Sequence, residues 1–198
     1  MRTVDGSPLA FMKQLSKSRL MSYRQCHRKL WLDVRAPELR VYSDDAQTRF
    51  AVGNQLGIIA RDLFDPEGWG AVLDPHQEGW QEALARTQDL LRQQQPIFEA
   101  AFHIHGALCL ADILLPASQG TWRMVEVKSS TYKTDKKGNP ELKNVLRDDI
   151  AFQAYVARAA GLSLAAVSLA LVDSKWVYSG GGDYRGLLRE VDLTSEAL

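Results

Sequence analysis

Hydrophobic positions in the first half of the chain recur at the spacing of an α-helix. In residues 16–34 apolar side chains return every three or four positions, and Ser16 is a good N-cap residue. We therefore expect one helix there, ending before Pro37. The segments 45–64 and 77–94 show the same spacing and predict two more helices. The first half of the chain is thus expected to be mainly helical.

After Pro96 the pattern changes to short apolar runs that alternate with polar residues. The runs IFEAAFHIH, ALCLADILLP and TWRMVEVKSS are separated by short connections that contain glycine. Short glycine-bearing connections are typical of β-hairpins. The sequence therefore predicts three consecutive antiparallel strands.

The remaining pattern predicts a crossover connection. A polar loop over 131–144 leads into a helical pattern over 145–160, which Gly161 would end. SLAAVSLALV then predicts a buried strand, and KWVYSG predicts a shorter one. A strand, a helix and another strand in succession imply a parallel pair. The expected fold is α/β (α+β), a mixed sheet flanked by helices with a helical N-terminal segment.

Composition fits one globular domain. The chain has 198 residues, of which 45% are hydrophobic and 24% charged, enough for a sizeable core. We expect a single domain over 1–198, with 1–15 flexible, 16–94 mainly helical and 97–178 forming the core. No apolar run approaches the roughly 18 residues of a membrane helix. Two cysteines are too few for a disulfide framework, so a cytoplasmic protein without membrane contact is expected.

The net charge of zero hides an uneven distribution. Residues 13–40 hold eight Lys or Arg against two acids, a charge of +6, and residues 123–147 hold seven against three, a charge of +4. Residues 44–99 hold four against ten, a charge of −6. The two basic segments are either a surface that binds nucleic acid or ordinary solvated faces.

The strand run TWRMVEVKSS carries an acid and a base on one face. Val125 and Val127 point one way, whereas Glu126 and Lys128 point the other. Asp112 lies in the preceding strand, so a hairpin would bring it close to Glu126. Two close carboxylates need a shared proton or a cation, and a hard ion such as Mg²⁺ suits them. The alternative is a structural ion cluster at the sheet edge.

These motifs together resemble the PD-(D/E)XK nuclease superfamily, and more narrowly its RecB-like branch, which is related to the CRISPR-associated RecB-like exonucleases. SKSRLMSYRQCHRKLWL resembles the N-terminal helix of that branch, and FAVGNQLGIIARDLF resembles the glycine-bearing helix that follows. IFEAAF, ADILLP and EVKSS resemble its core strands, and DDIAFQAYVARAAG resembles the next helix. The resemblance covers roughly residues 16–178. It implies a restriction-endonuclease-like sheet with the catalytic core at 97–178.

What the resemblance implies is metal-dependent hydrolysis of phosphodiester bonds. Asp112 and Glu126 would bind Mg²⁺ or Mn²⁺, and the backbone carbonyl of Val127 would add a ligand. Lys128 would position the attacking water. Glu99 is a further acidic candidate, with a surface strand residue as the alternative interpretation. The implied catalytic set is Asp112, Glu126, Lys128 and Gln153.

The chain also departs from the family pattern. Gln153 would orient the catalytic lysine or a phosphate oxygen, but the residue four positions later is Ala157 where the family has tyrosine. Gly57 stands where many RecB-like sites have a histidine ligand. Cys26 matches the first of four iron–sulfur cysteines, but with Cys109 the chain has only two. No complete iron–sulfur cluster is expected from this chain alone.

Two functions are consistent with this pattern. One is a nuclease acting on DNA single strands or duplex ends; the other is an inactive module of the same fold that binds nucleic acid or takes part in a larger assembly. The chain is also a candidate fragment of a longer, multi-domain protein. In the nuclease the basic residues of the first helix and the polar loop would contact phosphates. They are Arg24, Arg28, Lys29, Lys133, Lys136 and Lys137.

Overall fold

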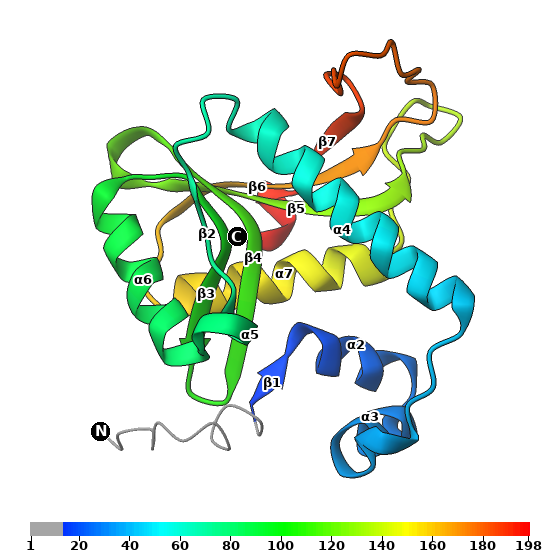
Figure 1. The fold of residues 1–198 in the computed structure, drawn as a ribbon, viewed down its shortest axis with the longest axis vertical. Helices are drawn as coiled ribbons and strands as arrows, with labels where there is room; N and C mark the ends of the chain where they lie inside the picture. Colours follow the sequence, from blue (N-terminus) through cyan, green and yellow to red (C-terminus); the bar gives the residue numbers. More distant parts are fainter. Residues whose placement is uncertain (1–13) are drawn as a thin grey trace.

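The structure is a computed structural model that describes residues 14–198. One mixed sheet runs through the molecule in the order β2-β3-β4-β5-β6-β7, and β1 pairs with β4 outside this path (Figure 1). The strands are β1 (Leu15–Ser16), β2 (Ala71–Val72), β3 (Ile97–Ile104), β4 (Ala107–Pro116), β5 (Trp122–Thr131), β6 (Leu164–Val172) and β7 (Leu188–Asp192).

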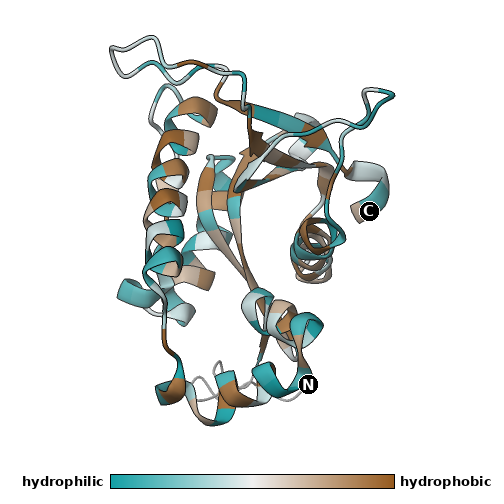
Figure 2. Ribbon diagram, turned by 90° about the vertical axis from the view of Figure 1, so that its right-hand side faces the viewer, coloured by the Kyte–Doolittle hydropathy of each residue, from teal (hydrophilic) through white to brown (hydrophobic). Residues whose placement is uncertain are grey.

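Helices cover both faces of this sheet. In Figure 2, α4 lies on one side of the sheet and α7 on the other. The α-helices are α2 (Lys17–Gln25), α3 (His27–Arg35), α4 (Asp44–Phe64), α5 (Pro75–Glu78), α6 (Trp80–Gln93), α7 (Asn144–Ala159) and α8 (Thr194–Ala197). Two short 3₁₀ helices, Pro37–Leu39 and Ser118–Gly120, complete the elements. The expected α/β class with a mixed sheet flanked by helices is confirmed.

The central strands follow the hydrophobic pattern closely. β3, β4 and β5 form the expected antiparallel meander, and the crossover through α7 makes β6 parallel to β5. Alternation along β5 separates two cores: Met124 packs in the cluster that contains Ala154 of α7, whereas Val125 packs in the cluster that contains Ala60 of α4. Glu126 follows Met124 on the α7 face, as the period of two requires.

The expected first helix is two helices. α2 ends at Gln25, α3 begins at His27, and Cys26 between them has extended backbone angles (φ −168°, ψ 128°). Ser16 does cap α2, because its hydroxyl accepts from the Arg19 N–H. The prediction of one continuous helix over 16–34 is therefore wrong, although its two ends lie close to the observed ones.

The segment KWVYSG is not a strand. The last strand is β7, which pairs antiparallel with β6. Trp176 and Tyr178 of that segment instead join Tyr184 in a group of rings whose centroids lie 5.2–5.9 Å apart. Aromatic residues predict strands because they fill half-buried surfaces. Here Trp176 and Tyr184 lie in a loop and pack against the cluster of Leu56 and Ile59 of α4.

The N-terminal segment expected to be flexible falls mostly outside the described part of the chain. Residues 1–13 lie outside it, whereas Leu15 belongs to β1 and pairs with Ala107 of β4. Within residues 14–198 no helix combines the length and the apolar character needed to cross a membrane.

Candidate functional site

The site lies where the sheet forks. β4 and β5 pair from Pro116–Trp122 to Ile113–Val125, and the ladder ends there. Asp112, the next residue of β4, accepts a hydrogen bond of 2.9 Å from the Val127 N–H through its side chain. A carboxylate thus replaces a strand-to-strand bond at the fork. β3 occupies the other edge of β4, so β1 pairs with Ala107 and Leu108 on the edge that β5 leaves.

Glu126 is the most buried acid of this site, with 1% of its surface exposed. Its Oε1 lies 2.5 Å from Nζ of Lys17 and 2.5 Å from Nζ of Lys128. Its Oε2 accepts a bond of 2.8 Å from the side-chain amide of Gln153. Burial alone would raise the pKa of Glu126, but the two ammonium groups outweigh it and lower the pKa to about 2. Glu126 is therefore held as an anion.

Lys128 is oriented by two acids from different elements. Besides Glu126, its Nζ lies 2.6 Å from Oδ2 of Asp149 on α7. Burial lowers the pKa of Lys128, but Glu126 and Asp149 raise it above the ordinary lysine value overall. The helical spacing explains this arrangement: Asp149 and Gln153 are four residues apart, so both face the sheet from one side of α7. The sequence predicted that Gln153 would orient Lys128 or a phosphate oxygen. In the structure the side-chain amide of Gln153 instead donates to Glu126, and the acid that pairs with Lys128 from α7 is Asp149.

Asp112 completes the group at the edge of the site. Its Oδ1 lies 3.9 Å from Nζ of Lys17, and its side chain keeps 24% exposure. Burial raises the pKa of Asp112 well above its ordinary value, and the charge of Glu126 adds to the rise. Since the same ammonium contacts Glu126, the two carboxylates converge on one position, as the hairpin predicted.

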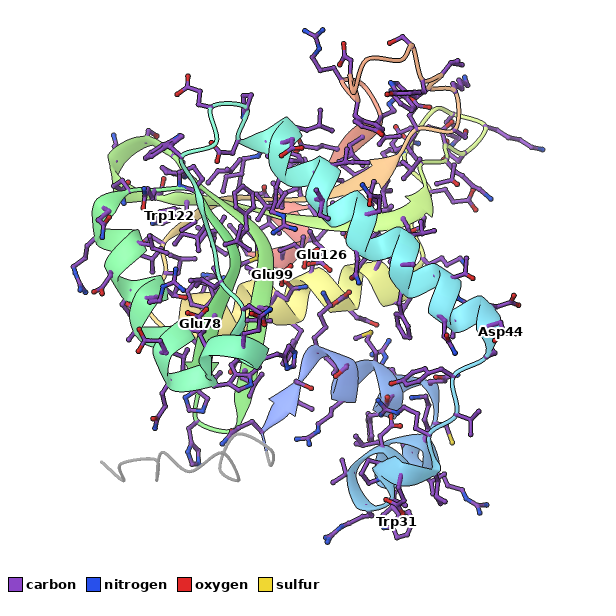
Figure 3. The ribbon with its side chains drawn as sticks, in the orientation of Figure 1. Trp31, Asp44, Glu78, Glu99, Trp122 and Glu126 are labelled. Carbon is purple, nitrogen blue, oxygen red and sulfur yellow. The ribbon has the colours of Figure 1, made fainter. Side chains whose placement is uncertain are left out.

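Glu99 of β3 lies opposite Asp112 of the neighbouring strand β4. The pairs Phe98–Ile113 and Ala100–Ala111 bracket these two residues in the ladder. Glu99 has a φ of 58°, in a left-handed region that residues other than glycine rarely adopt. Burial raises its pKa, and the charge of Glu126 contributes. In Figure 3, Glu99 and Glu126 lie close together in the centre of the molecule. Glu99 is half-buried, so it is not an ordinary surface residue.

A cavity of about 310 Å³ opens on this group from the α4 side. Asp112 and Glu99 line it from the sheet, and Gly53, Gly57 and Arg61 line it from α4. A Cβ atom added at Gly53 or Gly57 would meet nothing within 4 Å, so they leave open space above the carboxylates rather than a tight contact within the protein.

The basic residues do not gather into one patch. α2 and α3 lie at one end of the molecule and the loop after β5 lies at the other, in both views (Figures 1 and 2). Arg24 pairs with Asp148 of α7 at 2.6 Å, and Lys29 pairs with Asp33 at 2.8 Å. The others are exposed, namely Arg28, Lys133, Lys136 and Lys137. Their contact with nucleic acid stays a prediction.

The oxygen atoms at the fork are the kind of ligand that a hard divalent cation prefers. Asp112, Glu126 and the Val127 carbonyl are oxygen donors, which Mg²⁺ and Mn²⁺ prefer. Gln153 Oε1 is buried and has no hydrogen-bond partner within the described chain, so a further oxygen is available. In residues 14–198 no three His, Cys, Asp or Glu side chains are grouped so that they could hold a metal ion. The Lys17 ammonium contacts all three acids, Asp112, Glu126 and Asp149.

Lys17 and Asp149 were missed by the sequence interpretation. Asp149 carried a usable signal, because it lies one turn before Gln153 on the buried face of α7. Lys17 carried none, since it is the first residue of an exposed helix and lies 109 positions from Glu126. Only the β1–β4 pairing brings it to the fork.

No model of a known protein family matches the chain, and no curated protein matches it. Among solved structures, one described as "Crystal structure of SSO0001" is similar at a TM-score of 0.41 and 12% sequence identity. The alignment covers 92% of this chain and 68% of that chain. A similarity at this level identifies neither a shared fold nor a shared activity.

Proposed function

We propose that this protein is a divalent-metal-dependent nuclease that hydrolyses DNA phosphodiester bonds, acting on single strands or ends. The supporting observation is the convergence of Asp112 and Glu126 on one ammonium position beside Lys128. Asp112 also lines a cavity that opens on the α4 side of the sheet. Two acids and a lysine in this order are the set that the PD-(D/E)XK resemblance implies. A cytoplasmic location belongs to the same proposal.

In this proposal Asp112 and Glu126 hold Mg²⁺ or Mn²⁺, with Val127 and Glu99 as further oxygen donors. The bound ion would supply positive charge for the scissile phosphate and lower the pKa of a water. Gln153 fixes Glu126 through its amide bond of 2.8 Å. Lys128, aimed by Asp149, binds the attacking water or the developing negative charge.

The cavity supports an extended anionic substrate. Arg61 lines it together with the open surface over Gly53 and Gly57, so a phosphate can approach the acids without displacing a side chain of α4. Exposed lysines of the loop after β5 would contact phosphates farther along the strand, which adds affinity without sequence preference.

One observation favours the second candidate, an inactive module of the same fold that binds nucleic acid or serves assembly. The ammonium of Lys17 already neutralises Glu126 at 2.5 Å and lies 3.9 Å from Asp112. A cluster balanced in this way is stable without a metal ion, and a purely structural role would need nothing more.

A degradation assay separates the two functions. Purified protein is incubated with labelled single- and double-stranded DNA in Mg²⁺ or Mn²⁺, beside Asp112→Ala and Lys128→Ala. We expect metal-dependent cleavage that both substitutions abolish while the circular dichroism spectrum is kept. Asp89→Asn is the control, because Asp89 is an exposed residue of α6 that pairs with Arg92 outside the cluster. Cleavage that is equal in all variants, or absent from all including the wild type on DNA and RNA, would overturn the nuclease proposal.

A further inference from the structure

We infer that Lys17 is an intramolecular counter-cation that competes with the divalent ion for Glu126 and holds the site closed in the metal-free protein. The inference rests on the proposed function, because it concerns the same carboxylates. It adds a residue and a form of regulation to that site: the ion gains access only when the Lys17 side chain leaves.

The ammonium of Lys17 lies among three carboxylates, where it balances their negative charge. Its Nζ lies 2.5 Å from Glu126 Oε1, 3.7 Å from Asp149 Oδ1 and 3.9 Å from Asp112 Oδ1. These acids come from β5, α7 and β4. Among the described residues, Lys17 is the one cation with ion-pair contacts to all three, whereas Lys128 contacts two.

The backbone delivers Lys17 to this position in a defined way. β1 pairs with the part of β4 that β5 has left, and Ser16 of that pair caps α2. Lys17 is the first residue of α2, so its direction is set by a strand on one side and a capped helix on the other. The pair Arg24–Asp148 ties the other end of α2 to α7. The location of the ammonium is therefore a property of the fold.

Exchange requires movement of one side chain alone. The Lys17 side chain is 29% exposed, against 1% for Glu126, so it can reach solvent along its flexible four-carbon stem. When it leaves, Glu126 keeps the bond from Gln153 and the ion pair with Lys128. One coordination position on Glu126 Oε1 is freed, next to Asp112. The divalent ion then replaces one positive charge by two.

Calorimetric titration of Mn²⁺ tests this competition directly. Removing the ammonium with Lys17→Met should lower the dissociation constant for Mn²⁺ roughly ten-fold or more, since a competing unit charge is removed from beside Glu126. Lys17→Arg keeps the charge and should stay near the wild type. Lys175→Met is the matched control for the charge change, because Lys175 lies in the exposed loop after β6.

A thermal-shift experiment gives a second readout that does not depend on activity. Without metal, Lys17→Met should melt below the wild type, because buried Glu126 loses one of its two ammonium partners. Saturating Mn²⁺ should raise the Tm of Lys17→Met more than that of the wild type. A variant that loses stability in both conditions by the same amount would show a structural role only and would contradict the inference.

The outcomes also separate this inference from the proposed function. If wild type binds Mn²⁺ through Glu126, as judged by the absence of binding in Glu126→Gln, but Lys17→Met binds no tighter, the competition is refuted and the nuclease proposal stands. If neither wild type nor Lys17→Met binds Mn²⁺, both ideas fail together. Binding by Lys17→Met alone supports the competition and shows that Lys17 excludes the ion from the wild type.

Discussion

Asp149 of α7 and Lys128 of β5 form an ion pair of 2.6 Å beneath the fork of the sheet. The pair joins the helix of the crossover to the strand that precedes it, so the direction of the lysine depends on how α7 packs. Lys128 also contacts Glu126 at 2.5 Å. Two fixed partners leave this ammonium little freedom.

Replacing Asp149 should therefore disturb the reaction more than the binding of metal. In Asp149→Asn the lysine loses one of its two anionic partners, and we expect kcat for DNA cleavage to fall roughly 10- to 100-fold. KM and the Mn²⁺ affinity should change little, because Glu126 and Asp112 remain. Steady-state kinetics of this variant beside Asp89→Asn, which alters an exposed acid of α6, measure the difference. Partial recovery in Asp149→Glu would confirm a positioning role, and equal losses in both asparagine variants would refute it.

The two carboxylates of the fork should respond to pH in opposite ways in the metal-free protein. The raised pKa of Asp112 means that the folded state binds its proton more tightly than the unfolded state. Stability from this group is therefore lost as pH rises from about 4 through the raised pKa. Glu126 has a lowered pKa, about 2, so its contribution is present above its ordinary pKa and is lost as pH falls toward 2.

Replacing each carboxylate by the amide of the same shape, and measuring stability at two pH values, tests these opposite effects. At pH 7 and without metal, Asp112→Asn should raise Tm, because it removes a carboxyl group whose charged form is disfavoured in the folded protein. The amide oxygen of asparagine can still accept from the Val127 N–H. Glu126→Gln should lower stability by on the order of 3 kcal/mol. At pH 4 the Asp112→Asn difference should vanish while that of Glu126→Gln persists. Denaturant melts at both pH values suffice, and shifts of the same sign at pH 7 would contradict the assignment.

Substitutions at Gly57 should affect the stability of the protein and its activity differently. A Cβ at this position meets nothing within 4 Å, and glycine inside a helix costs roughly 1 kcal/mol relative to alanine. Gly57→Ala should therefore stabilise the protein by about that amount. Gly57→Leu should keep the stability but fill the cavity beside Asp112, and so lower kcat/KM for DNA. Gln55→Ala, on the same helix but away from the cavity lining, should leave kcat/KM unchanged.

The exposed lysines of the loop after β5 should contribute salt-sensitive affinity. Neutralising Lys136 and Lys137 should weaken single-stranded DNA binding for all sequences alike and reduce the slope of log K against log salt by roughly 0.7 for each phosphate that the protein no longer neutralises. Lys29→Ala should change that slope less, because Lys29 is already paired with Asp33 at 2.8 Å. Fluorescence anisotropy at several salt concentrations measures both, and an unchanged slope in the loop variant would remove this loop from the interface.

The sequence was most informative where side chains alternate over a long run. The meander of β3, β4 and β5 followed from period-two patterning and glycine-bearing turns, and the hairpin alone brought Asp112 toward Glu126. Alternation fixes the face of each residue, so the register of a neighbouring strand decides which acids meet.

Other features depend on interactions that a local pattern does not contain. The apolar spacing continues in phase across Cys26, so two short helices and one long helix look alike from sequence. Trp176 and Tyr178 are residue types typical of a strand, but each stacks on Tyr184 within a loop. Lys17 acquires its role only through a pair of residues in β1 that bonds to a strand about ninety positions away.

The shortness of β1 has a practical consequence for anyone who alters the chain upstream of the site. Two residues, Leu15 and Ser16, set the alignment of this segment against Ala107 and Leu108. Because neighbouring strand positions face opposite sides, a slip of one residue would turn the following ammonium away from Glu126. A change upstream that shifted this register would thus disturb the candidate site, although it alters none of the residues that form it.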